Sequence, residues 1–414
     1  MDSPWFFSPD LIVLGLFLIF SIAFLAHSGS FSNIARALIP GNLALQDGPF
    51  SLRKAASSYE NYRKLSMNES SRMRVASSSI LRSQRRLVHQ LSYSQKLDAL
   101  DASIHANAAL TENIARLAHH DYPASFPITS SFPQKGNAVS GDVGRVREAL
   151  KHFVRDWSQE GSQEREKMFS HILEVLERVP GDERKEQRVL VPGAGLGRLA
   201  WEISRLGFDT TANELSYYMI LAFRFLLSPS ATNRVNQHII QPYSHWFSHQ
   251  KSNNALFRSI AFPDALPRLS PTFHLLEEDF LLLKPPSPTP PSPHAFYSSE
   301  EITYLDAGYD YIVTLFFIDT SLNVISTIQH IHALLRPGGT WINLGPLLWT
   351  AGAQAKVELS LEEVLNVAEG VGFTLEEMEG GERTKEVPCE YTADRQAMMR
   401  WIYRAEFWVA RKGK

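Results

Sequence analysis

The residues with the clearest chemical meaning lie in the stretch VLVPGAGLGRLA at positions 189–200. Its β-favouring residues lead into Gly193, Gly195 and Gly197 and then into a helical pattern, and the acidic Glu214 ends the next predicted strand. Glycines let the backbone approach a ligand closely, and an acid at the end of a second strand can accept hydrogen bonds from ribose hydroxyls. The stretch therefore predicts a binding site for a nucleoside cofactor.

The spacing of the glycines separates two classes of cofactor. Enzymes that bind dinucleotides usually carry G-x-G-x-x-G, whose third glycine permits close packing of the helix that receives the pyrophosphate. Here the glycines follow G-x-G-x-G, and Arg198 occupies the position of that third glycine. This form resembles the first motif of S-adenosylmethionine methyltransferases, so we expect S-adenosyl-L-methionine rather than a nicotinamide cofactor. A glycine turn that holds no ligand is the structural alternative.

The composition bounds the possible classes of protein. With 414 residues, 44% of them hydrophobic, the chain can bury a large core, and we expect one catalytic domain with an N-terminal extension. A net charge of −3 provides no basic field for nucleic acid. The single cysteine, Cys389, excludes an internal disulfide and a zinc–cysteine cluster and fits a reducing compartment. The 14 histidines lack metal-ligand spacing, so we expect no metal site.

The N-terminus carries an apolar segment, Leu11–Leu25, which approaches the length of about 20 residues that a membrane-spanning helix needs. A cleaved signal peptide is the competing interpretation, but signal peptides begin with basic residues and this chain begins with Asp2 and Asp10. Basic residues such as Arg36 follow the segment, which favours a cytosolic position for everything after it. We therefore expect residues 1–30 to form a single-pass membrane anchor with the catalytic domain facing the cytosol.

Residues 51–145 are expected to form a helical region and a linker. Spaced leucines between positions 51 and 118 predict amphipathic helices in a hairpin, and the proline-containing segment 122–137 predicts the linker. The helical region also contains basic side chains that could face anionic lipid or simply solvent. These residues are Arg72, Arg74, Arg82, Arg85 and Arg86.

Residues 146–414 are expected to form the catalytic domain. A helical pattern over 144–179 is followed from residue 188 by alternating strands and helices, which predicts an α/β domain with a parallel, doubly wound sheet. The predicted strands are 188–193, 209–214, 273–279, 311–318, 340–347, 373–378 and 406–411. The predicted helices between them are 199–206, 216–227, 324–335 and 361–371. The proline-rich segment 284–294 is expected to be a surface insertion. Ligands of such sheets bind at the carboxyl ends of the strands, where Gly193, Glu214, Asp279 and Asp319 are all predicted to lie.

Several motifs together resemble one enzyme family, the carnosine N-methyltransferases. The resemblance covers residues 146–414 and rests on FVRDW at 153–157, residues 190–201, Asn213-Glu214, FPD at 262–264, FFIDT at 316–320 and residues 341–348. It implies a class I methyltransferase fold with a seven-stranded sheet and an N-terminal helical region that covers the cofactor. It also implies S-adenosyl-L-methionine-dependent methylation of an imidazole nitrogen, in carnosine or in a related histidine-containing dipeptide or peptide.

The same resemblance assigns cofactor contacts. Arg155 would bind the methionine carboxylate, with His152 beside it, and Glu214 would bind the ribose. The adenine would contact Asp279 and Phe280, and the methionine side would be lined by Leu315. Two structural alternatives stay open: Arg155 could form a surface ion pair with Asp156 or Glu148, and Glu214 could cap the helix that follows it.

For the acceptor, the resemblance makes Asp319 the main residue, since a carboxylate that accepts the imidazole N–H would orient the ring and stabilise the cation formed on methylation. Asp319 could instead cap the following helix. Tyr391 and Tyr403 match tyrosines near the substrate, although each could be a half-buried aromatic. Thr350 stands where the family carries histidine, and threonine cannot act as a base at neutral pH. The identity of the methyl acceptor is therefore left open by the sequence.

Two other classes of function remain as alternatives at this stage. A nicotinamide-dependent oxidoreductase is disfavoured by Arg198. A catalytically silent, membrane-tethered relative that only binds a cofactor or a partner is compatible with Thr350 and with the apolar N-terminus. A homodimer is left open by the sequence.

Overall fold

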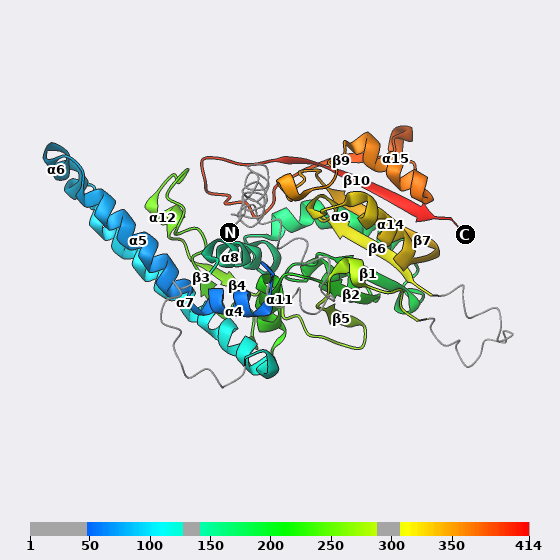
Figure 1. The fold of residues 1–414 in the computed structure, drawn as a ribbon, viewed down its shortest axis with the longest axis horizontal. Helices are drawn as coiled ribbons and strands as arrows, with labels where there is room; N and C mark the ends of the chain where they lie inside the picture. The colour runs from blue at the N-terminus through cyan, green and yellow to red at the C-terminus, as the bar shows by residue number, and fades with distance from the viewer. Residues whose placement is uncertain (1–47, 127–140, 288–306, 414) are drawn as a thin grey trace, which may run out of the picture.

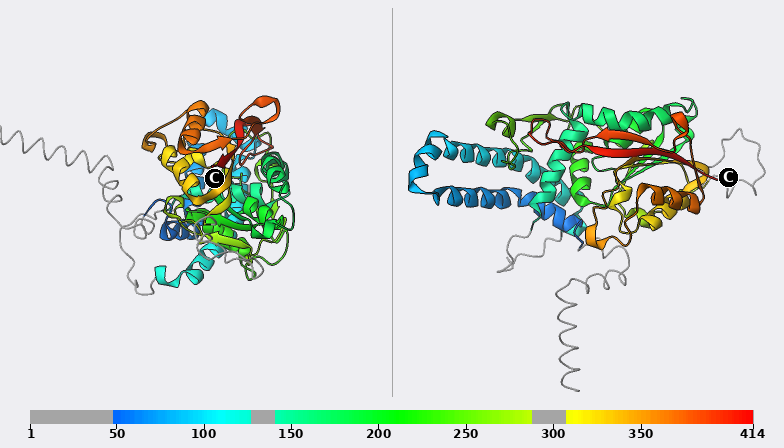
Figure 2. Two further views of the ribbon diagram at one scale, coloured as in Figure 1. Left: turned by 90° about the vertical axis from the view of Figure 1, so that its right-hand side faces the viewer. Right: turned by 90° about the horizontal axis from the view of Figure 1, so that it is seen from above.

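The computed structural model describes residues 48–126, 141–287 and 307–413. Within them, a long helical arm projects from one end of an α/β body (Figures 1 and 2). The anchor predicted at residues 1–30 lies outside the described residues, as do most of the predicted linker and most of the proline-rich segment. In the part of the chain that the structure describes, no helix is both long and apolar enough to cross a membrane.

The body is built on a mixed eight-stranded sheet. The strands lie in the order β5–β2–β1–β6–β7–β10–β8, and β9 also pairs with β10. The first five strands in this order are parallel, whereas β10 is antiparallel to β7, β8 and β9. Their bounds are β1 Arg188–Pro192, β2 Asp209–Asn213, β5 Phe273–Leu276, β6 Tyr309–Leu315, β7 Leu335–Gly345, β8 Phe373–Leu375, β9 Lys385–Cys389 and β10 Tyr403–Lys412.

The prediction of a parallel, seven-stranded sheet is therefore wrong in two respects. β10 is antiparallel because the chain enters it from β9 by a hairpin and not by a crossover helix, which a parallel partner would require. β9 was not predicted at all. Its sequence, KEVPC, buries only Val387 and Cys389, and Pro388 cannot donate a hydrogen bond to a neighbouring strand, so the strand signal is weak.

Helices cover both faces of the sheet, as the alternating pattern predicted. One core contains Ile312 of β6 together with helices α14 (Val324–Leu334) and α15 (Leu361–Val371). The other core contains Val313, the next residue of β6, because successive side chains of a strand point to opposite faces. Helices of the N-terminal region contribute to this second core together with four helices of the body: α8 Val143–Trp157, α9 Ser162–Glu177, α10 Arg198–Arg205 and α11 Tyr217–Leu227.

β5 and β6 each end three residues earlier than the predicted strands 273–279 and 311–318, and both ends shape the site. β5 stops at Leu276, and a short helical turn, η3, follows at Phe280–Leu282. β6 stops at Leu315 because Phe316 takes a positive φ of 51°, which a strand cannot accommodate. A second turn, η4 (Ile318–Thr320), then carries Asp319.

The predicted helical hairpin is confirmed in the N-terminal region. Its helices are α4 Leu52–Glu60, α5 Tyr62–Ser78, α6 Arg82–Gln90 and α7 Tyr93–Asp121. α5 packs along α7 to form the arm, and α6 forms its tip (Figure 2). The base of the arm shares a core with the body, and there the Tyr59 hydroxyl donates to the backbone carbonyl of Tyr218 in α11 at 2.5 Å.

The aromatic-rich excursion between α11 and β5 also packs against this arm. It contains a two-stranded sheet of β3 (His238–Ile240) and β4 (Ile260–Phe262), with the short helix α12 (Asn253–Leu256) between them. Asn107 of α7 forms a paired contact with Gln241, because its amide donates to the Gln241 carbonyl at 3.0 Å and its side-chain oxygen accepts from the Gln241 N–H at 2.8 Å.

Candidate active site

The glycine turn at the end of β1 adopts a conformation that only glycine tolerates well. Gly193, Gly195 and Gly197 have φ values of 63°, 58° and 71°. A Cβ on Gly193 would lie 2.5 Å from the ring of Phe317, and one on Gly197 would lie 2.3 Å from the ring of Phe223. The outer two glycines are therefore fixed by packing, whereas the space above Gly195 is bounded by the polar side chains of Arg155 and His152.

Glu214, at the end of β2, bridges this turn and the start of α11. One carboxylate oxygen accepts from the Gly195 N–H at 2.8 Å, and the other accepts from the N–H groups of Leu215 and Ser216 at 3.0 and 2.8 Å. Ser216 is the N-cap of α11 and, in the described part of the chain, no side chain caps that helix, so Glu214 binds the segment just before the helix and the capping alternative is wrong. Burial raises the pKa of Glu214, and the three N–H donors work against that rise.

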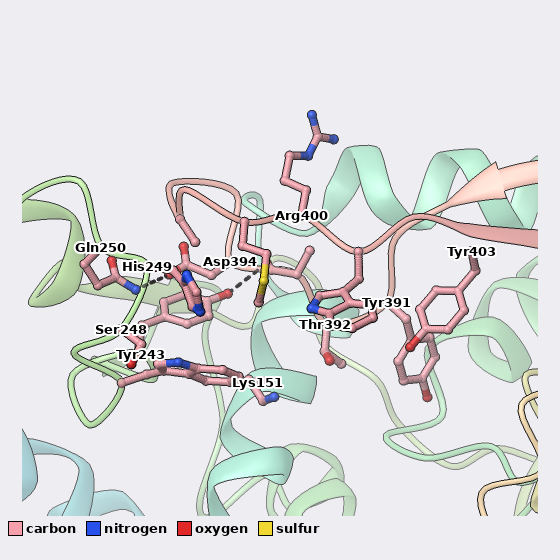
Figure 3. Close-up of a pocket in the computed structure, with 15 residues that line it drawn as sticks. Lys151, Tyr243, Ser248, His249, Gln250, Tyr391, Thr392, Asp394, Arg400 and Tyr403 are labelled. Atoms are coloured by element: carbon pink, nitrogen blue, oxygen red, sulfur yellow. Dashed lines mark hydrogen bonds between the residues drawn. The ribbon is translucent and has the colours of Figure 1, made fainter.

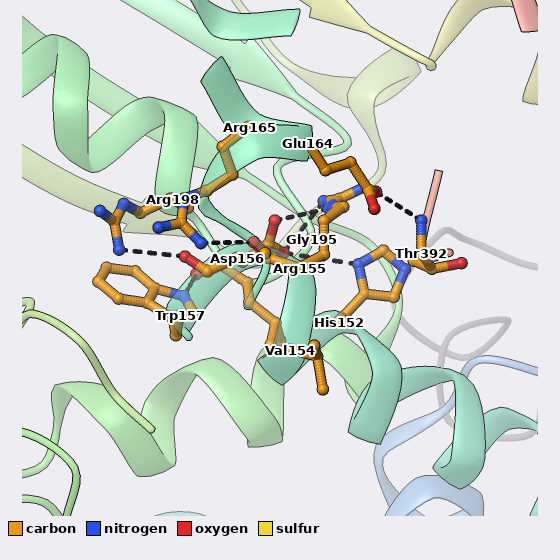
Figure 4. Close-up of polar contacts among 12 residues, drawn as sticks. His152, Val154, Arg155, Asp156, Trp157, Glu164, Arg165, Gly195, Arg198 and Thr392 are labelled. Atoms are coloured by element: carbon orange, nitrogen blue, oxygen red, sulfur yellow. Dashed lines mark hydrogen bonds and ion pairs between the residues drawn. The ribbon is translucent and has the colours of Figure 1, made fainter. Parts of the chain in front are cut away.

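Arg155 of α8 lies over the glycine turn, with its Nη2 atom 3.9 Å from where a Cβ of Gly195 would be. Its Nε and Nη2 atoms donate to both carboxylate oxygens of Asp156 at 2.6 and 3.0 Å, so the predicted ion pair exists, but it is buried (Figure 4). The third guanidinium nitrogen, Nη1, is buried and has no hydrogen-bond partner. Since an unpaired buried donor is costly, Nη1 indicates a position for an anionic group of a ligand.

His152 stands one helical turn before Asp156 and faces the same space. Its Nδ1 atom lies 3.5 Å from Asp156 without a hydrogen bond, and a Cβ on Gly195 would lie 4.0 Å from it. Burial and the charge of Arg155 lower the pKa of His152, so the ring is neutral near pH 7. Burial acts to raise the pKa of Asp156, but the Arg155 guanidinium outweighs it and the pKa falls to about 2.

Arg198, which distinguishes the glycine motif from the dinucleotide pattern, has a structural role. Its guanidinium donates to the carboxylates of Asp264 at 2.5 Å and Glu202 at 2.6 Å, and Arg165 donates to the same Asp264 carboxylate at 2.6 Å. The FPD motif thereby ties α9 and α10 together beneath Arg155. Arg198 does not reach toward the turn as a ligand-binding group.

The predicted adenine end lies at the neighbouring strand ends. Asp279 accepts a hydrogen bond from the Leu281 N–H at 3.0 Å. Phe280 is buried, and its ring meets the Phe317 ring edge-on with the two ring centroids 5.3 Å apart. Phe317 in turn packs over Gly193. Leu315 is the last residue of β6. The structure thus places Asp279, Phe280 and Leu315 around the same edge of the sheet as the glycine turn.

Aromatic side chains wall the site on the other side of Arg155. The Tyr391 ring lies 4.4 Å from the Arg155 guanidinium carbon and stacks on Phe316 at 4.6 Å. Tyr403, the first residue of β10, meets the other side of Phe316 edge-on at 5.4 Å. Phe316 is the residue with a positive φ directly after β6, and a non-glycine residue in that conformation is typical of a functional site.

Asp319 is buried beneath this wall. Its Oδ2 atom accepts from the Leu348 N–H at 3.1 Å, and its backbone carbonyl accepts from the Thr350 N–H at 3.0 Å. Burial raises the pKa of Asp319, with the Leu348 N–H opposing the rise, and burial and the charge of Asp319 together raise the pKa of Tyr403. α14 is capped by Asn323, so Asp319 is not the cap of that helix.

Thr350 is exposed, and its hydroxyl lies 3.5 Å from the backbone carbonyl of Asp319, at the outer limit of a hydrogen bond. Its structural contribution is made by the backbone N–H, which any residue other than proline could provide. A side chain at this position is therefore free to vary without disturbing Asp319.

A cavity of about 360 Å³ opens beside the two tyrosines (Figure 3). Lys151 of α8 lines it together with Tyr391 and Tyr403 from the β9–β10 segment, and Tyr243 and Trp246 line its other side. The volume lies within the range of small-molecule sites, and aromatic walls with a few polar groups are typical of them. The cavity was not predicted, because the residues that line it come from segments with no motif.

A clamp on the loop after β9 was also missed by sequence reasoning. The carboxylate of Glu164, in α9, accepts from the Thr392 and Ala393 N–H groups at 2.6 and 3.3 Å (Figure 4). Thr392 has a positive φ of 51°, which is rare for a β-branched residue. Glu164 lies in the polar stretch SQEREK, where nothing in the sequence distinguishes a buried carboxylate from a solvated helix face.

The strand order, with an antiparallel strand inserted between β7 and β8, defines a class I methyltransferase-like α/β fold. The solved structure of magnesium protoporphyrin IX methyltransferase from Synechocystis matches 66% of this chain and 95% of its own, at 10% identity and with a TM-score of 0.35. In the described residues, no group of three or more potential metal ligands occurs.

The sequence model of the carnosine N-methyltransferase family matches residues 133–414. Carnosine N-methyltransferase of Schizosaccharomyces pombe is 32% identical over 78% of this chain and 84% of its own length. The mouse enzyme of the same name is 35% identical over 66% of this chain, which spans only 64% of the mouse protein. The chain belongs to the carnosine N-methyltransferase family.

Proposed function

We propose that this protein is an S-adenosyl-L-methionine-dependent N-methyltransferase that acts on an imidazole nitrogen of carnosine or a related histidine-containing dipeptide. The observation that carries the cofactor assignment is the unpaired, buried Nη1 of Arg155 above Gly195, with the Glu214 carboxylate hydrogen-bonded to the same turn. A methionine carboxylate fits the first group and a ribose diol fits the second.

The residues present suit this cofactor along its whole length. Arg155 would hold the carboxylate, Glu214 the ribose, and Asp279 and Phe280 the adenine, while Leu315 lines the space between them. When bound, the cofactor supplies a methyl group attached to a positively charged sulfur. Tyr391 packs against the Arg155 guanidinium and also lines the cavity, so the cavity that would receive the acceptor lies next to the charged end of the cofactor.

On the acceptor side, Asp319 is the group suited to an imidazole. An imidazole has one unprotonated ring nitrogen that can attack a methyl carbon and one N–H that can donate to a carboxylate. With the N–H held by Asp319, the attacking nitrogen is fixed in the unprotonated state, and the positive charge that the ring gains lies beside a negative one. No residue of the protein needs to act as a nucleophile, and close alignment of the two substrates supplies much of the acceleration.

Several features of this proposal rest on the sequence alone and remain expectations. They are the single-pass anchor within residues 1–30, the cytosolic orientation of the catalytic body and a homodimeric state. They concern where the enzyme works and with how many copies, and the acceptor chemistry proposed above does not depend on them.

The proposal is tested by cofactor affinity and methyl transfer in the full-length protein and three variants. Arg155→Met should weaken S-adenosylmethionine binding by about 10- to 100-fold, which is the worth of charge-assisted hydrogen bonds, and Arg155→Lys should recover part of the loss. Arg205→Met, at an exposed position on α10, is the matched control and should bind normally. Unchanged affinity in Arg155→Met would refute the carboxylate assignment.

Methyl transfer is then measured with labelled cofactor and with carnosine, anserine, homocarnosine and histidine offered separately. Labelled product from carnosine or homocarnosine, and none from anserine, whose ring is already methylated, is the expected outcome. Cofactor binding without product from any imidazole would instead favour the catalytically silent alternative, which Thr350 leaves open.

A further inference from the structure

The tip of the helical arm has a surface that the catalytic function does not use. α6 contains no buried residue, and the residues flanking it are equally exposed. Four large apolar side chains at this tip are between 61% and 75% exposed. They are Val75, Leu81, Leu87 and Leu91. Single exposed apolar residues are common, but a group of them at the end of a projecting element indicates a contact surface.

The charge of the tip is one-sided as well. Residues 71–92, which include the tip and the end of α5 next to it, contain five arginines, three of them within residues 75–91, and no acidic residue. Among the described ion pairs of this segment, only those of Arg74 neutralise an arginine. Its guanidinium pairs with Asp98 and Asp101 of α7 at 2.8 and 2.5 Å. The tip therefore carries a concentrated positive charge in a chain whose net charge is −3.

The apolar and basic residues of α6 separate onto two sides when successive residues are placed about 100° apart around the helix axis. The apolar side consists of Leu81, Leu87, Val88 and Leu91. The basic side consists of Arg82, Arg85, Arg86 and His89. A short helix with one apolar and one arginine-rich side is the form that lies in the interface of a lipid bilayer, with the apolar side in the acyl region and the cations at the headgroups.

We propose that the tip of the arm, residues 75–91, docks on an anionic phospholipid bilayer. The charge selects an anionic surface over a neutral one, and the exposed leucines select a bilayer over a surface that is only charged. The shape supports the same partner, because the arm carries α6 away from the described part of the body, so that this part does not block the approach of a flat surface (Figure 2). This inference concerns the arm alone and holds whether or not the N-terminal segment is an anchor.

A probe on the arm tip tests the docking directly. Gln84 lies between Leu81 and Leu87 on the apolar side and is exposed, so Gln84→Cys can carry an environment-sensitive fluorophore in the full-length protein. The native Cys389 does not compete for the label, since it is buried and burial raises its thiol pKa to about 11. The same label on Glu362→Cys, exposed on α15 of the body, is the control for effects of the N-terminal segment.

The expected result is a blue shift of the tip label with vesicles containing about 30% phosphatidylserine, little shift with phosphatidylcholine alone, and loss of the shift at high salt. Arg85→Glu/Arg86→Glu should raise the lipid concentration that gives half of the blue shift by at least about tenfold. Leu87→Ser should also weaken the shift. Arg178→Glu/Lys185→Glu, which makes the same change in net charge on the exposed surface of the body, should have no effect.

Three results would overturn the proposal. A tip label that does not respond to anionic vesicles, or that responds equally to neutral ones, would exclude an anionic bilayer. A response that depends on protein concentration in the absence of lipid would assign the tip to a second copy of the chain. A response to an acidic protein or to RNA, but not to vesicles, would assign it to a different kind of partner.

Discussion

The cofactor end and the acceptor end of the site are built from different kinds of structure. At the cofactor end, Gly193, Gly195 and Glu214 lie directly at the ends of β1 and β2, and the pairing of those strands fixes their positions. At the acceptor end, the groups lie on loops: Asp319 after β6, and Tyr391 after β9. These loops are held by side chains such as Glu164, which come from elsewhere in the chain.

This difference indicates which positions of the protein can be substituted without loss of the fold. A substitution at the cofactor end disturbs the core, because the glycines contact buried rings and Glu214 bridges two elements. A substitution at the acceptor end, such as a different residue at the exposed position 350, leaves the sheet as it is. The fold therefore fixes the cofactor more firmly than it fixes the acceptor.

The largest effect is expected from Asp319→Asn, which tests the acceptor end. Loss of the carboxylate should lower kcat/KM for carnosine by about 10²- to 10³-fold, because an amide cannot compensate the charge on the methylated ring. Since burial raises the pKa of Asp319, folding is disfavoured by its ionisation, so the variant should be as stable as the wild type or more stable at pH 7. Cofactor affinity and a thermal melt provide these readouts, and a parallel loss of cofactor binding would contradict the division between the two ends.

The same pKa shift predicts a pH dependence. Activity should fall as pH decreases through the raised pKa of Asp319, where the carboxylate becomes protonated and can no longer accept the imidazole N–H. The acceptor imidazole itself also gains a proton in this region. The limb due to Asp319 is therefore identified as the part of the kcat profile that disappears in Asp319→Asn, measured at saturating acceptor.

At the cofactor end, Gly193→Ala should destabilise the fold by about 1–3 kcal/mol, because it combines a positive φ of 63° with a Cβ placed 2.5 Å from the Phe317 ring. Cofactor affinity should fall with it, by about tenfold. The matched control is Gly370→Ala in α15, where no atom lies within 4 Å of the new Cβ and alanine should stabilise the helix. Equal behaviour of the two variants in denaturant titrations would contradict this account.

A smaller effect is expected from Glu164→Gln, which loosens the loop that carries Tyr391. Glutamine offers one acceptor oxygen where the carboxylate offers two, so one of the contacts with Thr392 and Ala393 is lost. As a positioning residue, Glu164 should affect KM for the acceptor by roughly fivefold or more, with kcat and cofactor affinity changing less. Equal losses in all three quantities would indicate a general structural role instead.

The smallest effect is expected from Thr350→His. This variant tests most directly whether the acceptor end and the cofactor end are independent. Because Thr350 is exposed and contributes through its backbone N–H, histidine should be accepted without loss of stability. If the acceptor end alone decides the substrate, carnosine turnover should rise a few-fold while cofactor affinity stays constant. A change in cofactor affinity would show that the two ends are coupled.

The cofactor end could be predicted from the sequence more completely than the acceptor end, for physical reasons. Strand, turn and helix signals are local, so the glycine motif, Glu214 and the alternating helices were all found, and the structure places Asp279, Asp319 and Gly193 at one edge of the sheet as expected. The cavity beside Lys151 and the clamp at Glu164 depend on contacts between distant segments, for which periodicity carries no signal. β9 was missed for a related reason, since only its pairing with β10 makes its short sequence a strand.

The hairpin formed by β9 and β10 has one further consequence. Cys389 and Tyr403 are register partners, so the segment between them, residues 390–402, begins and ends at two neighbouring points of the same sheet. Because β9 and β10 fix its ends, a change in the length of this segment adds little loop-closure entropy, provided that the backbone contacts with Glu164 are kept. Residues 390–402 thus form an exchangeable cassette, and grafting the equivalent loop of a relative would transplant one wall of the acceptor cavity in a single step.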